Sequence, residues 1–205
     1  ICSTMFVSIG VLSIHISGNT STYAIIMIIG LIFGWIGDYF LHAKPSDAYF
    51  VTGFLTFLIG HFFYIGAYVR TLPKLFPEYE MISAVEIAVE ILFIALGLVA
   101  LKVFKVKLNP IILKIGIYFY FAIVTFMFIK ASALGYNYYK SGAPYGIVAF
   151  VLLSLGSLFF VLSDATLGII SFGGQKKNYR LKIFNILTYF WGQAMLASSI
   201  LFIEA

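Results

Sequence analysis

The stretch YGIVAFVLLSLGSLFFVLSDATLGIISF (145–172) decides the fold class of this chain. It holds one charged side chain, Asp164, in an apolar run longer than the roughly 20 residues that a helix needs to cross a bilayer. The run shows no period-two alternation of the kind found in membrane β-barrel strands. The stretch therefore predicts a transmembrane α-helix with an acid inside it.

Six further apolar runs share this character, and short polar segments separate them. The first run is short and opens the chain without Met, so we expect an N-terminal helix to be missing. No linker, repeat or low-complexity tract interrupts the sequence. We therefore predict a single all-α domain over residues 1–205, a polytopic integral membrane helical bundle with seven visible spans. The other runs cover residues 1–16, 23–41, 48–69, 83–101, 111–134 and 183–203.

The composition indicates that lipid is the solvent for much of the chain. Of the 205 residues, 62% are hydrophobic and 10% are charged, whereas soluble domains are about 45–50% apolar and about 25% charged. The single cysteine, Cys2, excludes an intrachain disulfide and a cysteine-based metal site. The net charge of +5 resides mainly in short loops, which favours topology signals and contacts with anionic lipid over a nucleic-acid interface.

Basic residues are biased toward one set of loops, which predicts the orientation. The loops after the second, fourth and sixth runs carry most of them, and the positive-inside rule places these loops in the cytoplasm. We expect a bacterial inner membrane or an endoplasmic reticulum membrane, with the C-terminus on the outer or lumenal side. The residues counted as cytoplasmic are Lys44, Lys102, Lys105, Lys107, Lys114, Lys176, Lys177, Arg180 and Lys182, and those counted on the other side are Arg70, Lys74, Lys130 and Lys140.

Five polar side chains within the apolar runs need an explanation: Asp38, His61, Tyr64, Asp164 and Gln193. An ionisable group in hydrocarbon costs roughly 2.5–3.5 kcal/mol on insertion scales. At about 1.5 Å of rise per residue, both aspartates fall in the cytoplasmic half of the membrane, and His61 and Gln193 fall nearer the midplane. The similar depth of two acids on separate runs predicts a shared site.

Purely structural readings compete with this one. Asp38 lies near a helix end, where interfacial water would satisfy its hydrogen bonds. His61 and Tyr64 would form a hydrogen-bonded pair between helices. Gln193 would join two helices through hydrogen bonds.

Two further acids, Glu86 and Glu90, open the fourth run near its outer end. We expect them to face water or to pair with Arg70 or Lys74, outside the site.

The polar residues lie within motifs that resemble the lysoplasmalogenase (YhhN-type) membrane family. The segments GDYFL (37–41), YFVTG (49–53), Phe57 and HFFY (61–64) are similar to its Gly-Asp-x-x-Leu, Phe-x-x-Gly, Phe and His-x-x-Tyr elements. Tyr120 with Met127 and Ala131 resembles its next element. SLFFVLSD (157–164) and YFWGQAML (189–196) resemble its Leu-Phe-x-x-Ser-Asp and Tyr-Tyr-x-x-Gln-x-Leu segments. The motifs occur in order over residues 30–205.

The resemblance implies eight helices in the full chain and hydrolysis of the vinyl ether bond of lysoplasmalogens. The products are a fatty aldehyde and glycerophosphocholine or glycerophosphoethanolamine. The expected partners are the lysophospholipid substrate and the bilayer, with no nucleic acid, no cofactor and no metal. The family's residues correspond to Asp38 and Asp164 as catalytic groups, and to a substrate-orienting set of His61, Tyr64, Tyr120, Ser163, Tyr189 and Gln193.

Two carboxyl groups suit this reaction. Protonation of the β-carbon of a vinyl ether leaves an oxocarbenium ion, to which water adds before the hemiacetal collapses. The acid must remain protonated near neutral pH, and burial favours the neutral form of a carboxyl group. A second, ionised carboxylate stabilises the cation and takes a proton from water, as in glycosidases. We assign Asp164 as the acid and Asp38 as the base; the reverse assignment stays open at this point, because such a pair titrates as a unit.

Two other classes of function use the same residues. A metal hydrolase would hold Zn²⁺ through Asp38, His61 and Asp164, although the sequence has no HxxxH or HExxH spacing. A small proton-coupled transporter would use the buried acids as a proton relay, although no broken helix or inverted repeat is visible.

Overall fold

A computed structural model describes residues 3–43, 46–106, 108 and 111–203 of the chain. Over these residues the protein is all-helical and has no strand, which confirms the predicted fold class. Cys2, Lys44 and Lys107, which entered the sequence arguments, lie outside the described residues. The elements are α1 (Thr4–Ser17), α2 (Thr22–Ala43), α3 (Asp47–Leu75), α4 (Ala84–Val103), α5 (Ile111–Lys140), α6 (Gly146–Phe172), α7 (Tyr179–Ser198) and a 3₁₀ turn, η1 (Ser199–Leu201).

Within the described residues, five helices, α2 to α6, are long and apolar enough to cross a membrane. The apolar helix α1 is shorter, and α7 opens with Arg180 and Lys182, which lower its hydropathy. Large apolar side chains cover much of the outer surface, and α4 has no buried residue at all. Such a surface requires hydrocarbon as its solvent. The chain is therefore a multi-pass membrane bundle.

The helix ends differ from the ends of the apolar runs, because hydrogen-bonded caps and not hydropathy fix them. The side chain of Asn178 accepts a hydrogen bond from the backbone N–H of Leu181, so α7 begins at Tyr179 and not at 183. It gives way to the 3₁₀ turn after Ser198, before the expected end at 203. Helices α3 and α5 continue past the expected ends at 69 and 134.

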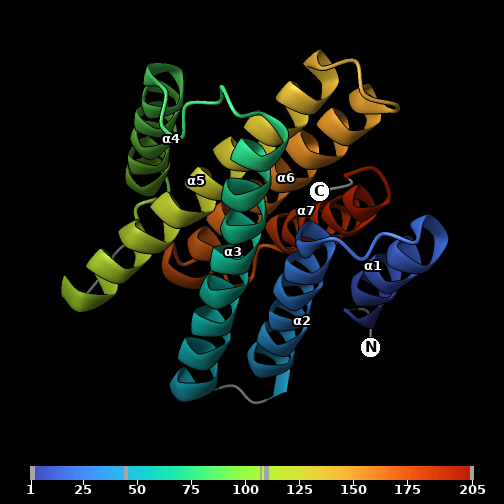
Figure 1. Ribbon diagram of the computed structural model, residues 1–205. Coiled ribbons are helices and arrows are strands. Elements are labelled where there is room, and N and C mark those ends of the chain that lie inside the picture. The colour runs from blue at the N-terminus through green and yellow to red at the C-terminus, as the bar shows by residue number, and fades with distance from the viewer. Residues whose placement is uncertain (1–2, 44–45, 107, 109–110, 204–205) are drawn as a thin grey trace.

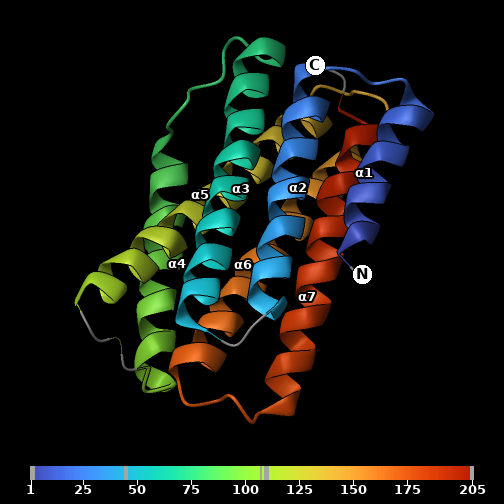
Figure 2. The ribbon, with the colours of Figure 1, turned by 90° about the horizontal axis from the view of Figure 1, so that it is seen from below.

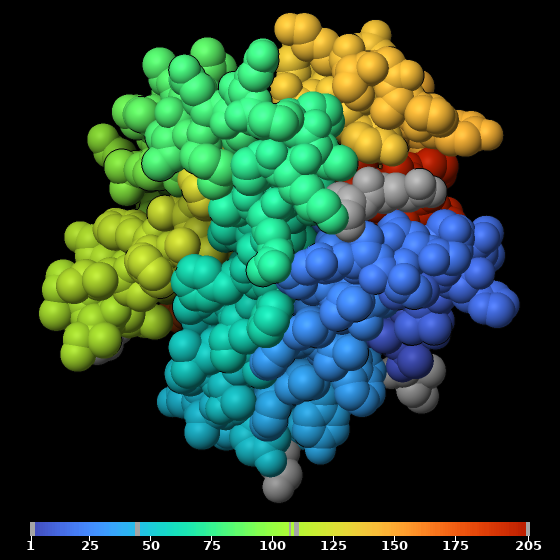
Figure 3. Space-filling view, in the orientation of Figure 1, coloured from blue at the N-terminus to red at the C-terminus, as the bar shows by residue number. Residues whose placement is uncertain are grey.

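The helices pack as two tightly joined groups. Helix α2 lies along α3, and α6 packs against both α5 and α7, while α1 covers α7 and α2 (Figure 1). In the space-filling view α2 and α3 share one face, and α4 lies at its edge (Figure 3). Helix α4 packs mainly against α5.

The C-terminal ends of α2, α4 and α6 lie at the same end of the bundle (Figure 2). We call this the lysine-rich end. Its described basic residues are Lys102, Lys105, Lys114, Lys176, Lys177, Arg180 and Lys182.

Glycines allow α7 to approach its neighbours closely. A Cβ atom on Gly192 of α7 would lie 2.8 Å from the carbonyl oxygen of Gly156 on α6. A Cβ atom on Gly34 of α2 would lie 2.7 Å from Nε2 of Gln193. Both distances are too short for a side chain. The glycines therefore hold the polar face of α7 between α6 and α2.

A buried ion pair fixes the start of α4 to α5. The side chain of Lys130 is 1% exposed, and its Nζ donates to Glu86 Oε2 over 2.9 Å, to Tyr79 Oη over 3.1 Å and to the carbonyl oxygen of Met81. Glu86 also completes a capping box with Ser83. Burial and the nearby Glu86 raise the pKa of Tyr79, so its neutral hydroxyl donates to Glu86. We call Lys130, Glu86 and Tyr79 the α4 anchor.

The expected pairing of Glu86 is therefore wrong. Glu86 pairs with Lys130 and not with Arg70 or Lys74, and its side chain is 12% exposed. Glu90 accepts a hydrogen bond from Thr125 Oγ1 at 2.9 Å. The sequence showed these acids near the outer end of α4, but it did not show that α5 places Lys130 and Thr125 opposite them.

Candidate active site

A chain of hydrogen bonds from three helices ends on Asp38. The hydroxyl of Tyr189 on α7 donates to Asp38 Oδ2 over 2.8 Å. Gln193, one turn further along α7, donates to Tyr189 Oη at 3.5 Å and accepts from the hydroxyl of Tyr64 on α3 at 2.8 Å. In these three hydrogen bonds each donor is directed along the series that ends at the carboxyl group of Asp38. The series therefore suits an ionised Asp38, which can only accept hydrogen bonds.

A second group of side chains surrounds Asp164. The hydroxyl of Tyr120 on α5 donates to Asp164 Oδ2 over 2.7 Å. The Nε2 atom of His61 on α3 lies 3.5 Å from the same oxygen and has no hydrogen-bond partner among the described residues. His61 Nδ1 lies 2.6 Å from the carbonyl oxygen of Phe57 and must donate to it. In the neutral ring, Nε2 is thus an acceptor that faces Asp164.

Aromatic rings pack between His61 of one group and Tyr189 of the other. Phe160 packs edge-on against His61, with ring centroids 4.7 Å apart, and against Tyr189 at 5.6 Å. Phe57 contacts the other side of Tyr189 at 5.8 Å. Hydrogen bonds and charges act more strongly in such low-dielectric surroundings than in water.

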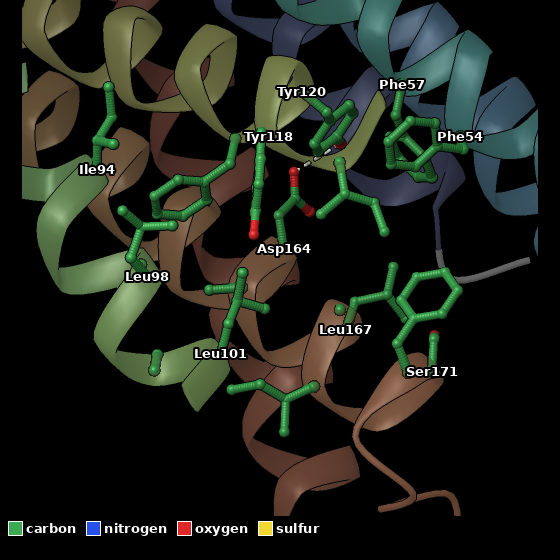
Figure 4. A pocket seen from close by; sticks show the side chains of 18 of the residues that line it. Phe54, Phe57, Ile94, Leu98, Leu101, Tyr118, Tyr120, Asp164, Leu167 and Ser171 are labelled. Carbon is green, nitrogen blue, oxygen red and sulfur yellow. Dashed lines mark hydrogen bonds between the residues drawn. The ribbon is translucent and has the colours of Figure 1, made fainter. Parts of the chain in front are cut away.

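Two cavities meet at Asp164. The first, of about 930 Å³, is lined by both aspartates and by residues of α1, α2, α3, α6 and α7, and we call it the two-aspartate cavity. The second, of about 410 Å³, lies between α3, α4, α5 and α6 and is lined almost entirely by apolar side chains; we call it the apolar cavity. Figure 4 shows Asp164 at its inner end, bonded to Tyr120. Asp38 lines the first cavity only.

A sequence model described as the YhhN family matches residues 2–200. The chain belongs to the YhhN family. This is the family of lysoplasmalogenases that the motifs resemble. Searches of curated proteins and of solved structures gave no match.

In this YhhN-family chain the side chains singled out from the sequence come from five helices and gather around the two cavities. Asp38 and Asp164 line one cavity, and Tyr64, Tyr189 and Gln193 form the network on Asp38. His61 and Tyr64 share a face of α3 but do not bond to each other, because each reaches a partner on another helix.

Ser163 has a different environment from the rest of the set. It lines the two-aspartate cavity, but its backbone oxygen and Oγ accept hydrogen bonds from Asn185 Nδ2 at 2.8 and 2.9 Å. These bonds join α6 to α7 beside Asp164.

Sequence reasoning missed two polar residues of this YhhN-family site, and helix periodicity could have found both. Asn185 lies one turn before Tyr189 on α7, so that Asn185, Tyr189 and Gln193 share a face. His42 lies one turn after Asp38, and its Nδ1 is 2.8 Å from the Asp38 carbonyl oxygen. Both residues line the two-aspartate cavity.

The geometry does not assemble the ligands that a metal hydrolase would need. Across the described part of the chain, no three His, Cys, Asp or Glu side chains are placed to hold one metal ion. His61 approaches Asp164, whereas Asp38 bonds to Tyr189.

Proposed function

We propose that this protein is a hydrolase that cleaves the vinyl ether bond of lysoplasmalogens inside the membrane. The observation that carries the proposal is that Asp38 and Asp164 line one cavity and each accepts a hydrogen bond from a buried tyrosine. Membership of the YhhN family supports the same class of reaction. The products would be a fatty aldehyde and the glycerophospho head group.

The reaction needs one neutral and one ionised carboxyl group. The neutral acid gives its proton to the β-carbon, and the oxygen-bound carbon becomes an oxocarbenium ion. The ionised group takes a proton from water as the water oxygen bonds to that carbon. The bond between the hemiacetal carbon and the glycerol oxygen then breaks, and the hemiacetal hydroxyl proton ends on the glycerol oxygen. The proton held by the base returns to the acid, so the sum is addition of one water.

The positions of the two acids favour Asp164 as the proton donor. The β-carbon lies on the hydrocarbon side of a vinyl ether, and the ether oxygen lies on the head-group side. Asp164 borders both the apolar cavity and the two-aspartate cavity, whereas Asp38 borders only the latter. Asp164 can thus reach the β-carbon while Asp38 meets the water and the cation.

The neighbouring side chains fit this division of roles. The acceptor Nε2 of His61 faces the carboxyl group of Asp164 and suits its neutral, protonated form, and Tyr120 orients that carboxyl group. Tyr189 donates a hydrogen bond to Asp38 and Gln193 positions Tyr189, an arrangement that favours the ionised form of the carboxyl group. We assign Ser163 to holding α6 against α7 through Asn185.

We place the site in the cytoplasmic half of a bacterial inner membrane or endoplasmic reticulum membrane. Asp38 and Asp164 lie in the halves of α2 and α6 that are nearer the lysine-rich end. The positive-inside rule assigns that end to the cytoplasm, where its lysines can meet the phosphate of the substrate.

The test is aldehyde release from lysoplasmenylethanolamine by purified protein. Asp164→Asn should abolish release, whereas Asp47→Asn, a matched change at the exposed start of α3, should not. Release that also survives EDTA supports metal-free acid–base chemistry. Loss in EDTA with recovery in Zn²⁺ would point to the metal hydrolase, and lipid flux in vesicles without any product would point to a transporter.

A further inference from the structure

The two cavities lie side by side and not end to end. They share a wall made by Leu41, Phe50, Phe57, Asp164, Leu167 and Ser171. Along α6 the lining of the apolar cavity runs from Asp164 to Phe172 and that of the two-aspartate cavity from Ser163 to Ser171, both toward the lysine-rich end. Along α6 the distance from Asp164 to Phe172 is about 12 Å at the rise of an α-helix.

The apolar cavity has the chemistry of a hydrocarbon site. Apart from Asp164, its lining has no charged residue, and Phe54, Leu98, Leu101 and Leu167 face its interior (Figure 4). Its outer wall is α4, which packs mainly against α5 and buries none of its own residues. A lipid chain can therefore reach the cavity along the edge of α4 directly from the bilayer.

We infer, resting on the proposed function, that the alkenyl chain occupies the apolar cavity and the glycerophospho head group occupies the two-aspartate cavity. The substrate is then folded back on itself, with its vinyl ether at the turn beside Asp164. A cis double bond directs its two substituents to the same side, and a trans double bond directs them apart. The site thus selects lysolipids with a cis 1-alkenyl chain.

Two glycines give a matched pair of variants for the chain site. A Cβ atom on Gly168, which lines the apolar cavity, or on Gly116, which does not, would have no atom within 4 Å. Leucine fits at both positions, but only Gly168→Leu fills the cavity. Leu101→Trp fills it from α4 and serves as a second variant if the first folds poorly.

The experiment compares hexadecenyl and octenyl lysolipids as substrates, and adds calorimetric binding of a hexadecyl ether lysolipid, which cannot be hydrolysed. Gly168→Leu and Leu101→Trp should raise KM for the long chain and weaken ether-lipid binding by about tenfold, with little change for the short chain. Gly116→Leu should match the unmodified protein. Unchanged KM and unchanged binding in both cavity variants would overturn the chain site.

The folded conformation of the bound substrate is tested separately with cis and trans isomers of the hexadecenyl substrate. The cis isomer should be hydrolysed about tenfold faster, and equal rates would overturn the bend while leaving the chain site in place. If no isomer is hydrolysed, the proposed function fails. Selective loss of ether-lipid binding in Gly168→Leu would then still support the apolar cavity as a hydrocarbon site.

Discussion

Tyr189 on α7 donates its phenolic hydrogen to Asp38 Oδ2 on α2 across 2.8 Å, within a site otherwise walled by aromatic rings. This bond joins α2 to α7, two segments that are distant in the sequence. It orients the carboxyl group of Asp38 within the two-aspartate cavity.

Removal of this hydroxyl should slow the reaction without unfolding the protein. A hydrogen bond to a charged group contributes about 1.5–3 kcal/mol, so Tyr189→Phe should lower kcat by roughly 10- to 100-fold. Tyr179→Phe, at the exposed start of the same helix, is the control. Steady-state aldehyde release from both variants makes the comparison, and equal kcat values would exclude Tyr189 from the chemistry.

The division of roles between the two acids can be tested by rescue with a small carboxylate. Asp38→Ala leaves space in a large cavity, and formate, which is ionised at neutral pH, can replace a base there. We expect formate to restore part of the activity of Asp38→Ala and none of that of Asp164→Ala, because formate cannot replace a protonated acid. Rescue of the Asp164 variant alone would reverse the assignment.

The glycine at position 34 should control the geometry of the same network. A methyl group there would approach Gln193 Nε2 to 2.7 Å, so Gly34→Ala must displace the amide that bonds to Tyr189 and Tyr64. Overpacking of this kind costs about 1–3 kcal/mol. We expect a lower Tm and a lower kcat. Gly66→Ala on α3, where a Cβ atom meets nothing within 4 Å, should change neither.

Hydropathy was sufficient to find the helices and the two aspartates, Asp38 and Asp164, that lie within apolar runs. Asp164 stands out as the one charge in its run, and its depth alone predicted a site shared with Asp38. Tyr120 is different: nothing in the pattern of α5 marks it, and only the family motif pointed to it. Its importance comes from a contact with Asp164 that depends on how α5 crosses α6.

Long-range packing explains what the sequence did not reveal. The apolar cavity is built from five helices, and apart from Asp164 its lining residues do not differ from ordinary lipid-facing or core residues when they are taken singly. Glu86 was expected to pair with a basic residue near it in the sequence, but its partner, Lys130, lies on the next helix. Such partners are set by helix rotation, which the apolar runs do not specify.

The α4 anchor should contribute strongly to stability. Lys130→Met would leave Glu86, whose side chain is 12% exposed, without its partner, and breaking a pair with one fully buried member costs up to about 3–5 kcal/mol. The double change Lys130→Met with Glu86→Gln should recover much of that loss, because neither charge then remains. Lys140→Met, at the exposed end of α5, should leave Tm unchanged.

The measurement is thermal unfolding of the three variants in detergent, together with KM for a long-chain substrate. Because α4 forms the outer wall of the apolar cavity and packs mainly against α5, loosening its anchor should raise KM more than it lowers kcat. A Tm of Lys130→Met equal to that of the unmodified protein would mean that packing along α5 alone holds α4 in place.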